Sequence, residues 1–280
     1  AKSKEINISE CKIIDPINSE EIADFAEAYY LKRKDKGVSK EIALQTMQNG
    51  LFFGAMLVKH NLASGMVAGA ANTTADVLRA ALQVVGVMPG LKTVSSTFIM
   101  VSPRENDPTL LFADCAVVPN PTDEQLADIA SSTASTRRSI LGDEPYVALL
   151  SFSTKGSAEH ELVEKVRSAK SILDSRSVDF LYDGELQLDA AIVESIAKSK
   201  APGSNVAGRA NTLIFPDLQA GNIGYKLVQR LGAYEAIGPI IQGLAAPICD
   251  LSRGCSTDDI VNTAVLVLLM SQKNKKHIGG

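Results

Sequence analysis

The chain has 280 residues, and a hydrophobic content of 45% with 21% charged residues predicts a folded protein with a sizeable core. A formal net charge of −4, few aromatic residues and no tryptophan argue against nucleic-acid binding, which needs basic and stacking side chains. The longest apolar run, 260–270, is too short to cross a bilayer, and no signal peptide is recognisable. Four cysteines without C-x-x-C spacing indicate free thiols in a reducing, cytoplasmic compartment, and neither a disulfide framework nor a metal site.

The first sixty residues predict one short strand and two helices. Residues 11–14 resemble a strand that a following Asp-Pro pair ends, and 22–31 carry apolar residues at helical spacing. The charged residues 32–36 are typical of a solvated helix end. A second helix is expected over 39–60.

Residues 65–69 predict a buried strand that leads through a glycine-rich turn into a helix containing Arg79. Thr73 or Thr74 can cap that helix. Further along, segments rich in β-branched or other apolar residues predict strands over 93–101, 110–115, 146–150, 178–182 and 211–215.

A capping box of Thr122 and Gln125 predicts the start of the helix that carries Arg137 and Arg138. Nothing in the local pattern gives these two arginines a partner. Because arginine is mostly exposed in folded proteins, we expect both on the surface.

The segment 151–157 joins a strand to a helix expected over 158–174. A strand, a loop of hydroxyl residues and glycine, and then a helix form an arrangement that can hold a phosphate. The Walker pattern G-x-x-x-x-G-K-[ST] is absent, so the residues alone leave an anion-binding loop and an ordinary structural turn as alternatives. The candidate anion contacts are Ser153, Thr154, Gly156 and Ser157.

A polar loop at 250–256 leads into a helix with apolar residues from 260 to 270. Ser256 and Asp259 have the spacing of a capping box. A helix N-terminus offers free N–H groups to an anion, and Arg253 in the loop adds a guanidinium that can bind phosphate at two points. Two interpretations therefore stay open, a capped helix behind a polar turn and an anion-binding site.

Several segments of the chain resemble signatures of the phosphate acetyltransferases, within the phosphate acetyl/butyryltransferase family. The most specific is Asp250-Leu-Ser-Arg-Gly followed by Asp259-Ile-Val, and similar segments occur at 29–37, 70–79, 150–157, 183–191 and 198–210. Two positions depart from the family pattern, since Asn72 stands where many relatives have histidine and Ala80 replaces a proline. The resemblance extends over roughly residues 11–272.

Strands that alternate with helices between 65 and 260 predict parallel strands joined by crossover helices, hence an α/β protein. The resemblance implies two α/β domains with a cleft between them, in an architecture like that of isocitrate and isopropylmalate dehydrogenases. The first domain is expected to comprise 1–90 and 246–280, with the C-terminal helix returning to it, and the second 91–245. Relatives carry a further N-terminal strand and helix, so the first domain is expected to lack part of its sheet.

The resemblance implies reversible transfer of an acetyl group between acetyl phosphate and coenzyme A, with coenzyme A as a substrate and no metal. It places Asp259 as the base that takes the thiol proton. Ser252 is implied as the donor to the developing oxyanion, and Arg253 as a ligand of the phosphate. The three histidines all lie outside the glycine-rich loops and the 250–256 loop, which favours a carboxylate base.

More substrate contacts follow from the same resemblance. Arg79 is implied as a second ligand of the phosphate or acyl phosphate. Arg33 is implied to contact substrate or coenzyme A, and Arg230 is a weaker candidate for such a contact. The loop residues Ser153, Thr154, Gly156 and Ser157 match a family segment and are expected to bind substrate.

Alternatives stay open for both function and mechanism. A phosphate butyryltransferase would use the same chemistry with a larger acyl pocket, and a non-catalytic acyl-CoA-sensing domain, of the kind fused to some malic enzymes, would bind without turnover. Cys255, between Ser252 and Asp259, is the candidate for a covalent acyl-cysteine, although no histidine accompanies it as a base. The resemblance also suggests a homodimer that binds small molecules (coenzyme A, acetyl phosphate and phosphate), with no nucleic acid or membrane as partner.

Overall fold

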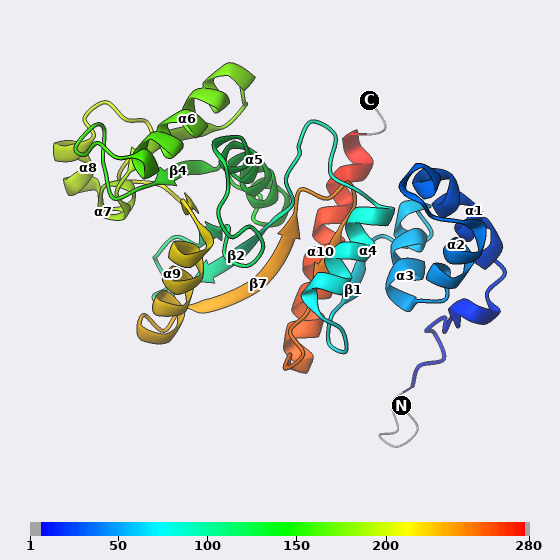
Figure 1. Ribbon diagram of the computed structural model, residues 1–280. Coiled ribbons are helices and arrows are strands. Elements are labelled where there is room, and N and C mark those ends of the chain that lie inside the picture. The colour runs from blue at the N-terminus through cyan, green and yellow to red at the C-terminus, as the bar shows by residue number, and fades with distance from the viewer. Residues whose placement is uncertain (1–6, 278–280) are drawn as a thin grey trace.

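The computed structural model describes the backbone of residues 7–277 and the side chains through Gln272, and it divides them between two lobes (Figure 1). In Figure 1 the small lobe, at the right, holds the blue and cyan N-terminal helices, and the large lobe, at the left, holds a six-stranded sheet. The C-terminal helix stands between them. None of the described helices has the length and apolar character needed to cross a membrane.

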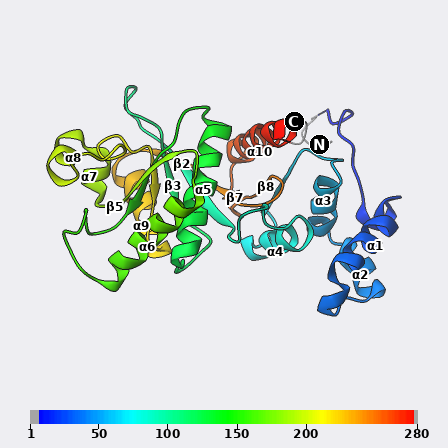
Figure 2. The same cartoon turned by 90° about the horizontal axis from the view of Figure 1, so that it is seen from above.

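The small lobe is organised on a two-stranded parallel sheet in which Met66 lies opposite Ile248 and Ala68 opposite Asp250. Helices on this sheet share one core that includes Phe25, Phe53, Met56, Val77 and Val84. Its elements are η2 (Pro16–Asn18), α1 (Ile22–Arg33), η3 (Lys34–Lys36), α2 (Lys40–Met47), α3 (Gly50–Lys59), β1 (Met66–Ala68), α4 (Thr74–Val84), β8 (Ile248–Asp250) and α10 (Thr257–His277). Helix α10, seen from above in Figure 2, contacts β1 and β8 of this lobe and also contacts α5 and β7 of the large lobe.

The large lobe has the strand order β5-β4-β6-β3-β2-β7. Its elements are β2 (Ser95–Val101), β3 (Leu110–Ala113), α5 (Asp123–Ile140), β4 (Tyr146–Leu150), α6 (Glu161–Arg176), β5 (Leu181–Leu186), α7 (Leu188–Ile192), α8 (Glu194–Lys200), β6 (Thr212–Ile214), α9 (Leu218–Leu231) and β7 (Glu235–Gln242). One core lies between the sheet and α5 and α6, and another between the sheet and α9. The predicted α/β class is confirmed.

Strand β2 departs from the prediction of parallel pairing throughout. It runs antiparallel to both β3 and β7, whereas β3, β4, β5 and β6 are parallel to their neighbours among themselves. A parallel neighbour requires a crossover of about a dozen residues or more, and the link 102–109 is too short for one. The link is instead a polar turn, in which the Ser102 hydroxyl donates to Asp107 at 2.7 Å.

Three predicted elements near the N-terminus differ in the structure. Residues 11–14 form no strand, because no described strand lies beside them, and Ile13 is 79% exposed. The helix expected over 39–60 is two helices, because Asn49 caps α3 by accepting from the Leu51 N–H at 2.9 Å. Strand β1 is half-buried, not buried.

Arg137 corrects the expectation that both arginines of α5 are surface residues. Arg137 is 2% exposed, and it donates to the carbonyls of Thr109 at 3.0 Å and Asn211 at 2.7 Å. It also pairs with Asp143 at 2.6 Å. It thereby ties the starts of β3 and β6 to α5, which is a structural role that its own sequence neighbourhood does not reveal.

The chain passes between the lobes twice, through 85–94 and 243–247, and we call these two segments the lobe crossing. They are joined to each other, since the Met88 N–H donates to the Gly243 carbonyl at 2.9 Å. The domain boundaries expected from the sequence, after residues 90 and 245, stay a prediction.

Candidate active site

A pocket of about 270 Å³ lies between the lobes, where the start of α10 faces the first half of β7 and the last turn of α9. We call it the Asp259 pocket. The small lobe contributes Asp250, Leu251, Ser252, Cys255, Asp259, Asn262 and Thr263, and the large lobe contributes Gln229, Glu235, Ala236, Ile237 and Gly238. The polar loop predicted from the sequence therefore forms one wall of a cavity that both lobes complete.

Asp259 caps α10 and also lines this pocket. The Ser256 N–H donates to Asp259 Oδ2 at 2.8 Å, and the Asp259 N–H donates to the Ser256 hydroxyl at 3.1 Å, so the predicted capping box is confirmed. These bonds, from the Ser256 backbone first and its side chain second, hold the pKa of Asp259 below its ordinary value. Oδ1 bonds to none of the described residues, so the carboxylate keeps one oxygen for a ligand.

The Ser252 hydroxyl is exposed at the wall of the pocket. The Gly254 N–H donates to Ser252 Oγ at 3.3 Å, and the Cys255 N–H donates to the Ser252 carbonyl at 3.0 Å. Because the oxygen acts as an acceptor within the loop, the hydroxyl proton stays free to be donated to a ligand.

Asp250 fixes this loop to the small lobe. It is 4% exposed, and its Oδ2 accepts a hydrogen bond at 2.5 Å from the hydroxyl of Thr74, the first residue of α4. A Cβ on Gly69 would lie 2.2 Å from Asp250 Oδ1, so a glycine is required beside the carboxylate. Burial raises the pKa of Asp250. The sequence did not reveal this contact, because Thr74 and Asp250 lie 176 positions apart.

The side chains of this pocket that could accept a proton from a substrate are carboxylates. Besides Asp259 and Asp250, Glu235 enters from the large lobe, and sequence reasoning missed it because its strand gave no chemical signal. His60 instead stacks on Phe25 with ring centroids 5.1 Å apart. His160 caps α6 by accepting from a backbone N–H, so neither of these histidines reaches the pocket.

None of the predicted arginines is among the described residues that line this pocket. Arg253 is exposed in the loop itself, and Arg230 is exposed in the last turn of α9 beside Gln229, which lines the pocket. Arg79 projects from α4 and pairs with Asp76 at 2.6 Å, with 56% of its side chain exposed. No metal cluster of three or more His, Cys, Asp or Glu side chains occurs among the described residues.

Arg33 lies at the other end of α4. Tyr29, one turn before it in α1, donates its hydroxyl to Gln83 in the last turn of α4 at 2.5 Å. Thr74, the residue that contacts Asp250, begins α4. At 1.5 Å per residue, about 15 Å of helix therefore separates the surroundings of Arg33 from the Asp250 contact.

Two lysines gather beside Arg33. Lys32 and Lys59 both donate to the Val84 carbonyl, at 2.6 and 3.1 Å. Burial, together with the charges of Lys59 and Arg33, lowers the pKa of Lys32 to about 8. The end of α4 is thus a cationic cluster at a distance from the Asp259 pocket.

The predicted phosphate loop at 151–157 is filled by a carboxylate of the chain itself. Ser153 donates its hydroxyl to Glu185 Oε1 at 3.0 Å, and the Gly156 N–H donates to the same oxygen at 2.8 Å. The Arg167 Nε donates to Oε2 at 3.2 Å. Burial acts to raise the pKa of Glu185, but the bonds from Gly156 and Arg167 outweigh it and the pKa is lowered.

The other two candidates of this loop bond within the large lobe as well. The Thr154 N–H donates to the Ser157 hydroxyl at 2.9 Å, and the Thr154 hydroxyl donates to Gln187 at 3.3 Å. The four predicted contacts of this loop are therefore engaged with one another and with residues of β5 and its continuation.

The 151–157 loop also lies far from the Asp259 pocket. The first residues of β7 line the pocket. The last residues of β3, β6 and β4 lie level with the last residues of β7, so the 151–157 loop, which follows β4, is at the opposite end of the strands. β4 is four positions from β7 in the sheet, about 19 Å at 4.8 Å per strand. Within one chain, the structure does not bring this loop together with Ser252 and Asp259.

The family model described as Phosphate acetyl/butaryl transferase matches residues 1–268. The chain belongs to this family. It is 55% identical over 271 residues to the phosphate acetyltransferase of Thermoanaerobacterium thermosaccharolyticum, across 95% of this chain and 82% of that protein. The predicted membership is confirmed.

The fold of this phosphate acetyl/butyryl transferase family member is similar to that of solved structures. The EutD phosphotransacetylase from Staphylococcus aureus superposes with a TM-score of 0.89 at 41% identity, over 96% of this chain and 82% of that one. A 4-hydroxythreonine-4-phosphate dehydrogenase from Klebsiella pneumoniae shares the fold alone, with a TM-score of 0.50 at 10% identity, over 82% and 72% of the two chains. The dehydrogenase-like α/β architecture expected from the sequence is confirmed.

Proposed function

We propose that the chain catalyses reversible exchange of an acetyl group between acetyl phosphate and coenzyme A at the Asp259 pocket. Curated relatives that are 46–55% identical carry the name phosphate acetyltransferase. The observation that carries the assignment of the site is that Ser252 and Asp259 line one pocket between the lobes, with Asp259 Oδ1 left open by the cap.

In the proposed step, both substrates occupy the pocket together. The thiol sulfur of coenzyme A bonds to the carbonyl carbon while Asp259 Oδ1 accepts the S–H proton. The carbonyl oxygen gains negative charge, and the Ser252 hydroxyl donates to it. The bond between carbon and the bridging phosphate oxygen then breaks, and phosphate leaves with its charge held by Arg253.

The lowered pKa of Asp259 determines whether the thiol proton of coenzyme A is transferred before or during formation of the C–S bond. A free thiol has a pKa of about 8.5, and the ordinary pKa of an aspartate is 3.8, so complete transfer before attack would cost about 6 kcal/mol or more. The S–H proton becomes much more acidic once sulfur bonds to the carbonyl carbon. Proton transfer is therefore concerted with formation of the C–S bond.

The remaining arginines are proposed to bind the charged parts of the substrates. Arg79 would exchange its partner Asp76 for the phosphate group, and Arg33 with its two lysines would hold an anionic part of coenzyme A, with Arg230 as a further contact. The substrate-binding role of the 151–157 loop stays a prediction, and its polar atoms would have to leave Glu185 to perform it.

The test of this function is release of free thiol from acetyl-CoA in phosphate buffer. We expect release to depend on both the chain and phosphate, and to reverse with acetyl phosphate and coenzyme A. A non-catalytic acyl-CoA-sensing domain would bind acetyl-CoA and release no thiol, and that outcome would contradict the proposal.

The acyl group is tested with the same assay. Because each methylene in an apolar pocket changes discrimination by about 10- to 200-fold, we expect kcat/KM for acetyl phosphate to exceed that for butyryl phosphate at least about tenfold. A ratio in the opposite direction would assign the chain as a phosphate butyryltransferase.

We further propose that the enzyme is a homodimer and acts in the cytoplasm, where its four free thiols would stay reduced. The outer face of α9 supports the dimer, because Ile223, Leu227 and Leu231 are 57%, 51% and 82% exposed at helical spacing. Such a stripe can pair with its own copy about a two-fold axis. Light scattering should give twice the monomer mass for the chain and the monomer mass for Leu227→Asp; a monomeric parent would contradict the dimer.

A further inference from the structure

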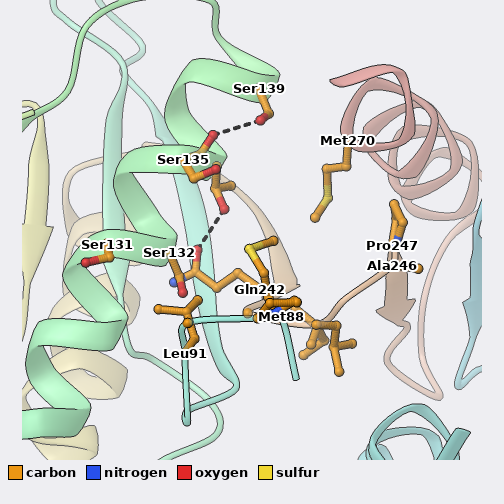
Figure 3. Close-up of a pocket in the computed structure, with 16 residues that line it drawn as sticks. Met88, Leu91, Ser131, Ser132, Ser135, Ser139, Gln242, Ala246, Pro247 and Met270 are labelled. Carbon is orange, nitrogen blue, oxygen red and sulfur yellow. Dashed lines mark hydrogen bonds between the residues drawn. The ribbon is translucent and has the colours of Figure 1, made fainter. Parts of the chain in front are cut away.

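A second pocket, which we call the crossing pocket, lies where the lobe crossing meets α5 and the far end of α10 (Figure 3). Its volume is about 280 Å³, room for roughly nine water molecules at liquid density. Met270 lines it three turns of α10 beyond Asp259, about 16 Å along the helix. The crossing pocket is therefore separate from the Asp259 pocket.

The lining of the crossing pocket selects against charge. None of the 16 described residues that line it is charged. Met88 and Leu91 of the first crossing segment form apolar wall, and in Figure 3 Met270 points across the cavity toward α5. Because an ion without a counter-charge loses its hydration on entry, this pocket does not suit coenzyme A, acetyl phosphate or phosphate.

One wall is polar and rigid. Gln242 is 1% exposed, and its amide is held by three hydroxyl groups: it accepts from Thr136 at 3.0 Å and donates to Ser95 at 3.0 Å and Thr133 at 2.8 Å. Ser132 beside this network is 5% exposed, and its hydroxyl has no partner among the described residues. A buried hydroxyl without a partner costs free energy, so Ser132 has an unused hydrogen bond, which a ligand in the pocket would reach after a small shift of this wall.

The pocket also adjoins both segments of the lobe crossing. Besides the bond from Met88 to Gly243, the Ala245 N–H donates to the Gly86 carbonyl at 3.0 Å, so the two crossing segments form a short antiparallel pair. Residues of both segments line the pocket. A molecule held against both segments and α5 would add contacts that favour the hydrogen-bonded pair.

We propose that the crossing pocket binds an uncharged small molecule with an apolar body and one hydroxyl or carbonyl group, which bonds to Ser132. The apolar body lies between Met88, Leu91 and Met270. Occupancy protects the hydrogen bonds of the lobe crossing. This binding is independent of the chemistry assigned to the Asp259 pocket.

The test uses three probes that share one ring, namely benzyl alcohol, toluene and benzoate, in ligand-detected NMR titrations of the full chain. We expect benzyl alcohol to bind with a Kd on the order of 1 mM, as suits so small a ligand. Toluene lacks the hydroxyl and should bind about fivefold more weakly, since one hydrogen bond is lost. Benzoate should show no saturable binding. Binding of benzoate as tight as that of benzyl alcohol would overturn the proposal.

Variants locate the binding. Ser132→Ala should bind benzyl alcohol and toluene equally, and its binding of toluene shows that the pocket is intact. Ser135 is exposed at the mouth of the pocket, and Ser135→Phe should abolish binding of both benzyl alcohol and toluene. The control Ser171→Phe, at an exposed position of α6 outside the pocket, should leave binding unchanged. Undiminished binding to Ser135→Phe, or a retained preference for benzyl alcohol in Ser132→Ala, would overturn the assignment.

Hydrogen exchange measures the effect on the lobe crossing. Saturating benzyl alcohol should slow exchange of the Met88 and Ala245 amides several-fold, and should leave them unchanged in Ser135→Phe. Slowing of the same size in Ser135→Phe would mean that the effect does not arise in the crossing pocket.

Discussion

The loops at 250–256 and 151–157 both combine hydroxyl groups, a glycine and a following helix, yet the structure uses them in opposite ways. In the first, Asp259 Oδ1 and the donor capacity of the Ser252 hydroxyl are not used by any of the described residues, and both side chains line a pocket. In the second, Glu185 takes the bonds of Ser153 and Gly156. We therefore expect a loop with the composition of an anion site to bind an external anion only where no carboxylate of the fold occupies it.

The difference lies in which groups the tertiary structure brings to each loop. Glu185 reaches the 151–157 loop from β5, the neighbour of β4 in the sheet. The 250–256 loop instead faces β7 and α9 of the other lobe across an open pocket. Changes at Ser252 and Asp259 should therefore alter turnover, and changes in the 151–157 loop should alter stability.

The largest effect is expected for Asp259→Asn. Asparagine keeps the capping bond but cannot accept the thiol proton, so kcat should fall about 10²- to 10⁴-fold with little change in KM or in the free energy of unfolding. Steady-state kinetics and urea denaturation measure the two quantities. A variant with near-normal kcat at neutral pH would leave Asp259 as a helix cap alone. Glu235→Gln, at the other exposed carboxylate of the pocket, is the matched control and should change kcat far less.

The next effect is expected for Ser252→Ala, which removes one donor to the developing oxyanion. We expect kcat to fall roughly 10- to 10³-fold. Ser153→Ala changes the same residue type in the other loop. As long as Glu185 occupies that loop, this variant should lower stability and change kcat less than about threefold. Equal losses of kcat in the two variants would erase the distinction between the loops.

Glu185→Gln should act on stability. The neutral side chain keeps the shape but loses charge-assisted bonds to Arg167 and Gly156, so the free energy of unfolding should fall by about 1–3 kcal/mol with turnover nearly unchanged. Glu159 contacts the same arginine from the surface, with 80% of its side chain exposed, and Glu159→Gln should cost less than about 0.5 kcal/mol. A larger loss of turnover than of stability in Glu185→Gln would give this loop a catalytic role.

The lowered pKa of Glu185 adds a pH dependence with a definite sign. Because the folded state favours the charged carboxylate, its stabilisation is present above the ordinary pKa of 4.5 and is lost as the pH falls through the lowered value. Denaturation midpoints should therefore drop more steeply below about pH 4.5 in the parent chain than in Glu185→Gln. Parallel pH profiles would contradict the lowered pKa.

The smallest effect is expected for Ser256→Ala. Loss of the cap should cost about 1 kcal/mol of stability and leave kcat within a few-fold of the parent, because Asp259 Oδ1 is not part of the cap. If kcat falls as far as in Asp259→Asn, the cap and the base cannot be separated in the way proposed.

Features that depend on neighbours in the chain were predictable. The capping boxes of Thr122 with Gln125 and of Ser256 with Asp259 each join residues three positions apart, and both were found. The strand and helix alternation gave the α/β class for the same reason, since periodicity is a local property.

Features that depend on distant partners were not predictable. Arg137 is buried because the carbonyls of Thr109 and Asn211 meet it, and Asp250 is fixed by Thr74. The filling of the 151–157 loop by Glu185 likewise needs a residue about thirty positions away. No spacing rule anticipates such contacts, because they are set by the strand order of the sheet.

The central claim is that acetyl phosphate and coenzyme A meet in the Asp259 pocket and that the acetyl group passes directly between them. Initial rates measured while both substrates are varied test this claim most directly. Intersecting double-reciprocal lines, unchanged in Cys255→Ala, are the predicted result. Parallel lines together with an inactive Cys255→Ala enzyme would contradict it, because they would show that the acetyl group first rests on the cysteine.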